Sequence, residues 1–270
     1  MPVADHDQGS RSPLDSLPLR YPGQSLDEQI DALAERVLES LLVPALALAA
    51  ALGSWLTFFG GTLWLPLILS AFGAAGVFWC WRKFPAALRE RDNLRLGRNG
   101  ERKVGQYLEY LRRDGYRVYH DITNGDHNID HAIIGPAGVF TIETKTISKP
   151  KRGQAEIVYD GVKVLVNGLA PDRDPLPQAL AQAREMRQLL RDVTGKDLRV
   201  CPVVVYPGWF VNYTGHGTSP DVRVMNPGFL PHFLPAFGKS LTTDEVEELG
   251  RMLDAALSKR ETERGNPPQP

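Results

Sequence analysis

Cysteine is nearly absent from this chain, and so are the signatures of several common enzyme classes. Two of the 270 residues are cysteine, Cys80 in an apolar run and Cys201 in a predicted strand. Such different surroundings argue against a disulfide or a zinc site and fit a reducing compartment. The sequence contains no P-loop, no Ser/His/Asp nucleophile set and no paired-cysteine motif. P-loop nucleotide hydrolysis and serine hydrolase chemistry are therefore not indicated.

Charge is absent from one long stretch. No Asp, Glu, Lys or Arg occurs between Leu41 and Trp81. Since a bilayer-spanning helix needs about 20 apolar residues, this run has the length of two spans, with Gly60 and Gly61 as the turn between them. The sequence therefore predicts a transmembrane helical hairpin over 41–81. The alternative is a buried helical hairpin in a soluble core. A signal peptide fits poorly, because the run starts late and follows an acidic segment.

The charges that flank this run predict its orientation. The turn carries no positive charge, whereas five basic residues follow the run closely: Arg82, Lys83, Arg89, Arg91 and Arg95. By the positive-inside rule the exit faces the cytoplasm, and a hairpin returns to the side that it left. We expect a multi-pass protein of the inner (cell) membrane, with its N- and C-terminal regions in the cytoplasm and the bilayer as a partner.

Composition and periodicity divide the rest of the chain. The expected parts are a disordered tail over 1–24, an amphipathic helix over 25–40 opened by a capping box at Ser25, the apolar hairpin over 41–81, a basic juxtamembrane linker over 82–96, a domain with a C-terminal helix over 97–258 and a disordered tail over 259–270. Within the domain we expect helices over 98–113 and 175–191, strands over 116–120, 200–206 and 221–225, and a hairpin of 155–159 with 162–166. The formal net charge is −1, so any nucleic-acid footprint must be local.

The most informative stretch is NIDHAIIGPAGVFTIETK, residues 128–145. It predicts two short strands, rich in β-branched and aromatic residues, around the turn Gly-Pro-Ala-Gly. If Ile134 and Val139 close an antiparallel hairpin, Asp130 lies directly opposite Glu143. Because side chains alternate along a strand, the two carboxyl groups then point to the same face.

Asp130 and Glu143 would lie about 5 Å apart at Cβ and repel each other by roughly 3 kcal/mol at an effective dielectric constant of about 20. Either one carboxyl group takes a proton or a cation lies between them. A divalent metal with oxygen ligands would remove the repulsion directly. Lys145, two residues beyond Glu143 on the same face, can reach a metal-bound water or an anionic substrate. The alternative is the polar, solvent-facing side of an edge hairpin.

An Asp followed by Glu-x-Lys on the next strand of a hairpin resembles the core of the PD-(D/E)XK nucleases. More narrowly, the run from Asn128 to Lys145, with Gly135 and Gly138 at its turn, resembles the nuclease-related domain family, NERD. The similarity extends from about residue 97 to about residue 207. It implies an α/β fold with a restriction-endonuclease-like mixed central sheet flanked by helices, here preceded by the two-helix transmembrane hairpin. It also implies nuclease activity that depends on Mg²⁺ or Mn²⁺.

The resemblance implies roles for single residues. Asp130 and Glu143 would bind the metal, with the Thr144 carbonyl as a further ligand, and Lys145 would be catalytic. A glutamate that follows a glycine in the first helix is part of the family motif and matches Glu101. Residues that would support the site or the substrate are Asn128, Gln178, Lys149, Lys151 and Arg152.

Some of these residues have simpler explanations. Glu101 falls on the inward stripe of its helix, and is either a third acidic group near the metal or a cap at the exposed end of that stripe. Lys149, Lys151 and Arg152 either contact a phosphate backbone or solvate a loop. By itself, a helical glutamine such as Gln178 is explained as an exposed polar residue on the protein surface.

Together these features predict a membrane-anchored, cytoplasm-facing, metal-dependent nuclease that cleaves phosphodiester bonds of nucleic acid, DNA rather than RNA. The alternative is a non-catalytic module that binds nucleic acid or a protein at the membrane. The sequence indicates no oligomeric state.

Reporter fusions test the orientation of the apolar hairpin. A hairpin with both ends on one side requires that fusions at residues 40 and 90 both report the cytoplasm, because the basic residues after the run hold its exit there. A fusion on the far side at either position would mean a single span. Release of the protein by a carbonate wash would mean no span at all.

Overall fold

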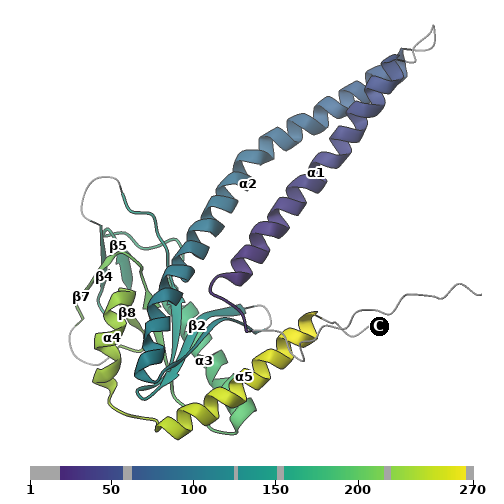
Figure 1. The fold of residues 1–270 in the computed structure, drawn as a ribbon. Coiled ribbons are helices and arrows are strands. Elements are labelled where there is room, and N and C mark those ends of the chain that lie inside the picture. Colours follow the sequence, from purple (N-terminus) through teal and green to yellow (C-terminus); the bar gives the residue numbers. More distant parts are fainter. Residues whose placement is uncertain (1–18, 57–62, 125–126, 151–154, 216–219, 266–270) are drawn as a thin grey trace, which may run out of the picture.

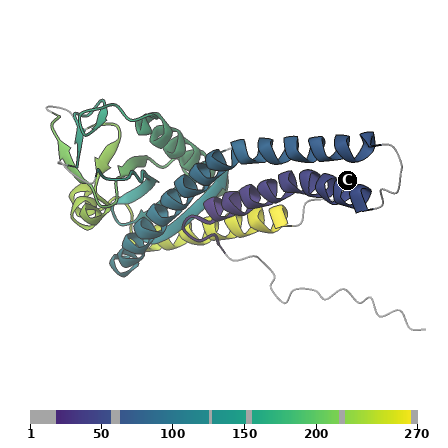
Figure 2. The ribbon, with the colours of Figure 1, turned by 90° about the horizontal axis from the view of Figure 1, so that it is seen from above.

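The computed structural model describes residues 19–56, 63–124, 127–150, 155–215 and 220–265. Helices α1 (Gln24–Leu56) and α2 (Trp64–Tyr110) project together from a mixed α/β domain (Figure 1). The view from above shows the same two helices running alongside each other (Figure 2). The molecule is therefore a globular domain with a long helical arm.

A five-stranded mixed sheet forms the centre of the domain, in the order β1-β2-β3-β6-β8. Its strands are β1 (Arg117–Asn124), β2 (His127–Gly135), β3 (Gly138–Thr144), β6 (Val200–Val205) and β8 (Arg223–Met225). β1, β2 and β3 pair antiparallel, whereas β6 and β8 run parallel to β3. β6 is an interior strand, as its apolar sequence predicts.

A second, three-stranded sheet has the order β5-β4-β7. β4 (Glu156–Tyr159) and β5 (Val164–Val166) form the expected hairpin, and β7 (Phe210–Tyr213), which the sequence did not predict, pairs parallel to β4. The remaining elements are η1 (Leu111–Asp114), α3 (Pro175–Thr194), η2 (Pro227–Phe229), α4 (Leu230–Phe233), η3 (Leu234–Phe237) and α5 (Thr243–Gly265).

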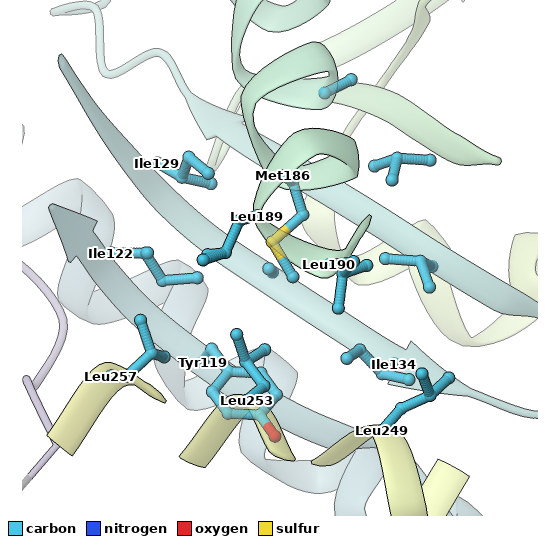
Figure 3. Close-up of a cluster of buried hydrophobic side chains, with 14 of the residues drawn as sticks. Tyr119, Ile122, Ile129, Ile134, Met186, Leu189, Leu190, Leu249, Leu253 and Leu257 are labelled. Carbon is cyan, nitrogen blue, oxygen red and sulfur yellow. The ribbon is translucent and has the colours of Figure 1, made fainter. Parts of the chain in front are cut away.

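Helices cover both faces of the main sheet. On one face α3 and α5 bury apolar side chains, among them Met186 and Leu253, against Ile134 and its neighbours (Figure 3). On the other face α2 buries Leu108 against strand residues that include Phe140. Each such side chain contributes about 1.5–3 kcal/mol when it is fully buried, so these two layers hold β2 and β3 in place.

Helix α2 is longer than the sequence predicted. It continues without a break through 82–96, the expected linker, so the helix expected to begin at Arg98 is the end of a 47-residue helix. The segment is rich in Arg, Leu and Ala, which are strong helix formers, and Pro85 does not end it. The helical segment ends at Gly115, which is left-handed at φ 81° and follows η1, as is typical of a glycine cap.

Both long helices are apolar enough and long enough to cross a membrane. Only 17% of the most apolar window of α1 and 11% of that of α2 is buried, which argues against the core hairpin of a soluble protein. A Cβ on Gly73 would lie 2.7 Å from Leu48 Cδ2, and one on Gly76 would lie 3.0 Å from Pro44 Cβ, so glycine permits the close approach of α1 and α2. The expected turn at Gly60–Gly61 lies outside the described residues.

The start of α1 is attached to the domain through Asp121 of β1, which is 1% exposed and has a φ of 50°. Its carboxylate accepts hydrogen bonds from the Ser25 N–H at 2.6 Å, the Ser25 hydroxyl at 2.7 Å and Arg20 Nε at 2.9 Å. The expected capping box at Ser25 is therefore wrong, because a carboxylate distant in sequence caps the helix and Glu28 pairs with Arg20 instead. We call Arg20, Ser25 and Asp121 the Asp121 clamp.

Both predicted tails are shorter than expected. Within the predicted tail 1–24, the described part includes Arg20, whose side chain is 6% exposed. At the other end, α5 continues to Gly265 rather than ending near Ser258. At its start, Thr242 and Glu245 exchange the reciprocal hydrogen bonds of a capping box.

Replacement of Arg20 by methionine tests the Asp121 clamp. It leaves a buried carboxylate without its cation, so we expect the free energy of unfolding to fall by about 3–5 kcal/mol, with a lower melting temperature for the full chain in detergent. The matched control is Arg91→Met, which removes an exposed ion pair with Asp92 and should cost at most about 1 kcal/mol. Equal losses from both variants would contradict this role of the clamp.

Candidate functional site

The β2–β3 hairpin has the register that the sequence predicts. Ile134 pairs with Val139 and His131 with Ile142. Asp130 and Glu143 follow one step beyond the last pair, with their side chains on the same face and close enough for each to affect the pKa of the other. The predicted convergence of the two acids is therefore confirmed.

Lys145 also lies where the sequence predicted. Its ammonium group is 2.6 Å from Glu143 Oε1 and donates a hydrogen bond of 2.7 Å to Gln178 Oε1. The Glu143 side chain is 2% exposed, whereas that of Lys145 is 24% exposed. Gln178 is thus a partner of the site lysine rather than a surface residue without a role, and the lysine is the more accessible of the pair.

Gln182 of α3 is a site residue that the sequence did not predict. Its Nε2 donates to Glu143 Oε2 and, at 3.0 Å, to the Asn128 carbonyl, while its own Oε1 is buried without a hydrogen-bond partner. A signal was present in the sequence, because Gln182 interrupts the apolar stripe that contains Ala179 and Met186. A polar residue on a buried stripe needs a polar partner, and here the partner is Glu143.

Glu101 is buried in the interior of α2, at 9% exposure, so the alternative explanation, an exposed helix cap, is wrong. The Gly23 backbone N–H, just before α1, donates a hydrogen bond to its carboxyl group. Beside it, a Cβ on Gly100 would lie 1.6 Å from Thr146 Oγ1, so only glycine lets α2 approach the segment after β3 this closely. This contact brings the third acid toward the hairpin.

The remaining predicted residues have different surroundings. The Thr144 N–H donates to Asp130 Oδ2 at 2.8 Å, and the Asn128 side chain donates to Asp121 Oδ1 at 3.3 Å. Lys149 lies apart from this hydrogen-bond network, with its ammonium group 5.7 Å from the centre of the Trp209 ring. Lys151 and Arg152 lie outside the described residues.

Burial raises the pKa of all three acids. Loss of hydration raises the pKa of Glu101 to about 8, with further contributions from the charges of Asp121 and Glu143. The pKa of Asp130 is raised well above its usual range by burial and by the charges of Glu143 and Glu101. Burial also raises the pKa of Glu143, although Lys145 and Gln182 oppose the shift. The site therefore favours bound protons or a cation.

The described residues contain no group of three or more His, Cys, Asp and Glu side chains arranged to hold a metal ion. The potential ligand set is therefore two carboxyl groups, Asp130 and Glu143, with backbone oxygens. Buried acceptors without a hydrogen-bond partner lie in the same segments, namely Gln182 Oε1, Thr144 Oγ1 and Thr146 Oγ1. An oxygen-rich site of this kind suits hard cations rather than zinc.

Residues 96–207 match the family model described as "Nuclease-related domain", NERD. This range contains all of the predicted site residues, from Glu101 to Gln178. Neither the curated proteins nor the solved structures contain a match to the chain.

The raised pKa of Glu101 predicts an unusual pH dependence of stability. Between its unfolded pKa of about 4.5 and its folded pKa of about 8, the native state binds more protons than the unfolded state. With EDTA present, the free energy of unfolding should therefore fall as pH rises through this window, by at most about 1.4 kcal/mol per pH unit for this group. Glu101→Gln should flatten the dependence, measured by melting between pH 5 and 9.

The control is Glu90→Gln, which changes an exposed carboxyl group on the same helix. It should keep the wild-type pH dependence. Stability that rises with pH in the wild type and in both variants would contradict a buried, protonated Glu101.

Proposed function

We propose that this chain, which contains a nuclease-related domain over residues 96–207, is a membrane-anchored nuclease that cleaves phosphodiester bonds with the help of a divalent metal. The observation that carries the proposal is the pair of acids, half-buried Asp130 and buried Glu143, with the Lys145 ammonium 2.6 Å from Glu143. Two acids can hold a cation, and a lysine beside them can stabilise negative charge. The mixed sheet that carries them supports a restriction-endonuclease-like arrangement.

The residues present fit Mg²⁺ or Mn²⁺. Mg²⁺ is commonly bound through one or two protein carboxylates and keeps several waters, so Asp130 and Glu143 suffice as protein acids, with the Thr144 carbonyl as a further oxygen ligand. The raised pKa of both acids gives a cation an energetic advantage, because it would take the place of a bound proton and relieve their repulsion. When bound, the metal would lower the pKa of a water molecule and polarise the phosphate.

Three side chains of the protein would have further roles in the reaction. Lys145, fixed between Glu143 and Gln178, would hold a water molecule or a phosphate oxygen and stabilise the charge that develops on it. Gln182 would keep the Glu143 carboxylate in one orientation. Glu101 would support the site from α2 as a third carboxyl group, which the Gly23 N–H helps to orient.

Membrane anchoring would place this site at a bilayer. Two helices of the chain are long and apolar enough to span it, and the second of them carries Glu101. The orientation that we propose is the one that the basic residues after Trp81 favour, with both terminal regions in the cytoplasm of a cell (inner) membrane. The cytoplasm supplies nucleic acid as substrate, and DNA is the substrate that we propose.

Substitution of the three central residues tests the chemistry. Asp130→Asn and Glu143→Gln should each abolish cleavage and weaken Mn²⁺ binding, while the melting temperature stays the same or rises because the repulsion is relieved. Lys145→Ala should keep Mn²⁺ binding and lose roughly 100- to 1,000-fold in turnover. The measurements are plasmid and oligonucleotide cleavage with Mg²⁺, Mn²⁺ or EDTA, and calorimetric titration with Mn²⁺, on the full chain in detergent.

Lys163→Ala, at an exposed position in the β4–β5 turn, is the matched control and should retain full activity. If the wild type gains no stability from metal and Asp130→Asn melts lower, the acids are structural. The chain would then be a non-catalytic module that binds nucleic acid or a protein at the membrane.

A further inference from the structure

A cavity of about 550 Å³ opens where the edge strands of the two sheets, β7 and β8, meet η2 and α4. We call it the aromatic pocket, after six of its lining residues: Tyr159, Trp209, Phe210, Tyr213, Phe229 and Phe233. Figure 1 shows β7, β8 and α4 on the side of the domain away from α1. The pocket is therefore a feature of the globular domain rather than of the apolar arm.

Three of these aromatic side chains are exposed to solvent. Phe210 is 68% exposed, Phe229 55% and Tyr213 48%. Phe210 and Tyr213 both lie on β7, an edge strand of the smaller sheet. Exposed aromatic rings gathered around one cavity contribute little to the core and are typical of a binding surface. Flat faces of this kind stack on nucleobases whatever the base sequence.

Positive charge accompanies the rings. The Arg223 guanidinium lies 5.8 Å from the centres of both the Phe233 and Phe237 rings, and Lys149 lies over Trp209. Among the described residues that line the pocket, none is acidic. Aromatic faces combined with cations suit a ligand that has both π surface and negative charge. An acyl chain would use the apolar surface and leave the cations without a role.

The aromatic pocket is close to the carboxylate site. In the main sheet Glu143 pairs with Val204, and Val204 with Val224, which lines the pocket. Two steps between neighbouring strands amount to about 10 Å. The chain that leaves Lys145 also contacts the pocket, because the Ile147 carbonyl accepts a hydrogen bond of 3.0 Å from the Trp209 indole N–H.

We propose that the aromatic pocket stacks an unpaired base of the nucleic acid whose backbone is held at Asp130, Glu143 and Lys145. The substrate would then be single-stranded, or would carry an unpaired strand next to the bond that is cleaved. Lys149, above Trp209, would contact the phosphate between the two sites. This inference rests on the proposed nuclease function, and it adds a substrate class to it.

The test is binding without cleavage. Fluorescence anisotropy of labelled oligonucleotides, with the full chain in detergent and EDTA present, should show tighter binding of a single strand than of a blunt duplex. Phe210→Ala and Phe229→Ala should each weaken single-strand binding about five- to a hundredfold, the range for loss of one stacked base. Phe210→Tyr should rescue binding, because the ring is kept.

The matched control is Tyr110→Ala, which removes a ring that is 63% exposed on α2 and away from the pocket, and it should not change the affinity. Unchanged single-strand affinity in the pocket variants would overturn the proposal, as would equal affinity of the wild type for the single strand and the duplex. If these variants lose binding of a fluorescent fatty-acid probe but keep their affinity for oligonucleotides, the pocket is instead a lipid site.

The two proposals can fail separately. If the wild type binds single strands through the pocket but cleaves nothing with Mg²⁺ or Mn²⁺, the nuclease function fails and the base-stacking pocket stands. If it cleaves duplex and single strand equally, and the pocket variants do so too, the nuclease function stands and the pocket proposal fails.

Discussion

The register of the β2–β3 hairpin places Asp130 and Glu143 on one face. Contacts from the surrounding structure offset the repulsion between these two acids. Lys145 and Gln182 each contact one oxygen of Glu143, and the Thr144 N–H contacts Asp130. These contacts come from β3 and α3, so the packing of α3 on the sheet also positions the acids. Burial makes each contact stronger, and it also raises the pKa of both acids, which favours either a bound proton or a cation beside them.

Local signals predicted most of the sheet and the centre of the site. The turn Gly-Pro-Ala-Gly fixed the parity of pairing, so the positions of Asp130, Glu143 and Lys145 followed from side-chain alternation alone. Asp160–Gly161 and Thr242–Glu245 likewise contain their own turn and cap chemistry. Where a turn, a strand pairing or a helix cap depends on a few neighbouring residues, the sequence was sufficient to predict it.

Long-range contacts account for what the sequence did not predict. Gln182 became a site residue because α3 packs across β3, a relation that no local pattern contains. The cap of α1 comes from Asp121, 96 residues away from Ser25. β7 is short and flanked by turns, so it forms a strand only because β4 is beside it. The basic character of residues 82–96 predicts a linker, whereas their high helix propensity lets α2 continue through them.

One consequence follows from the unbroken α2. Between Trp81, the last residue of the uncharged run, and Glu101 the helix makes 20 steps, so it rises about 30 Å and turns about 100° with each residue. The number of residues in this stretch therefore sets two quantities: the distance of the acids from the apolar arm along the helix axis, and their direction around that axis. The Asp121 clamp attaches α1 to the same domain, which prevents it from swivelling about α2. For an arm seated in a bilayer, the acids would lie at a fixed height above the membrane and face a fixed direction.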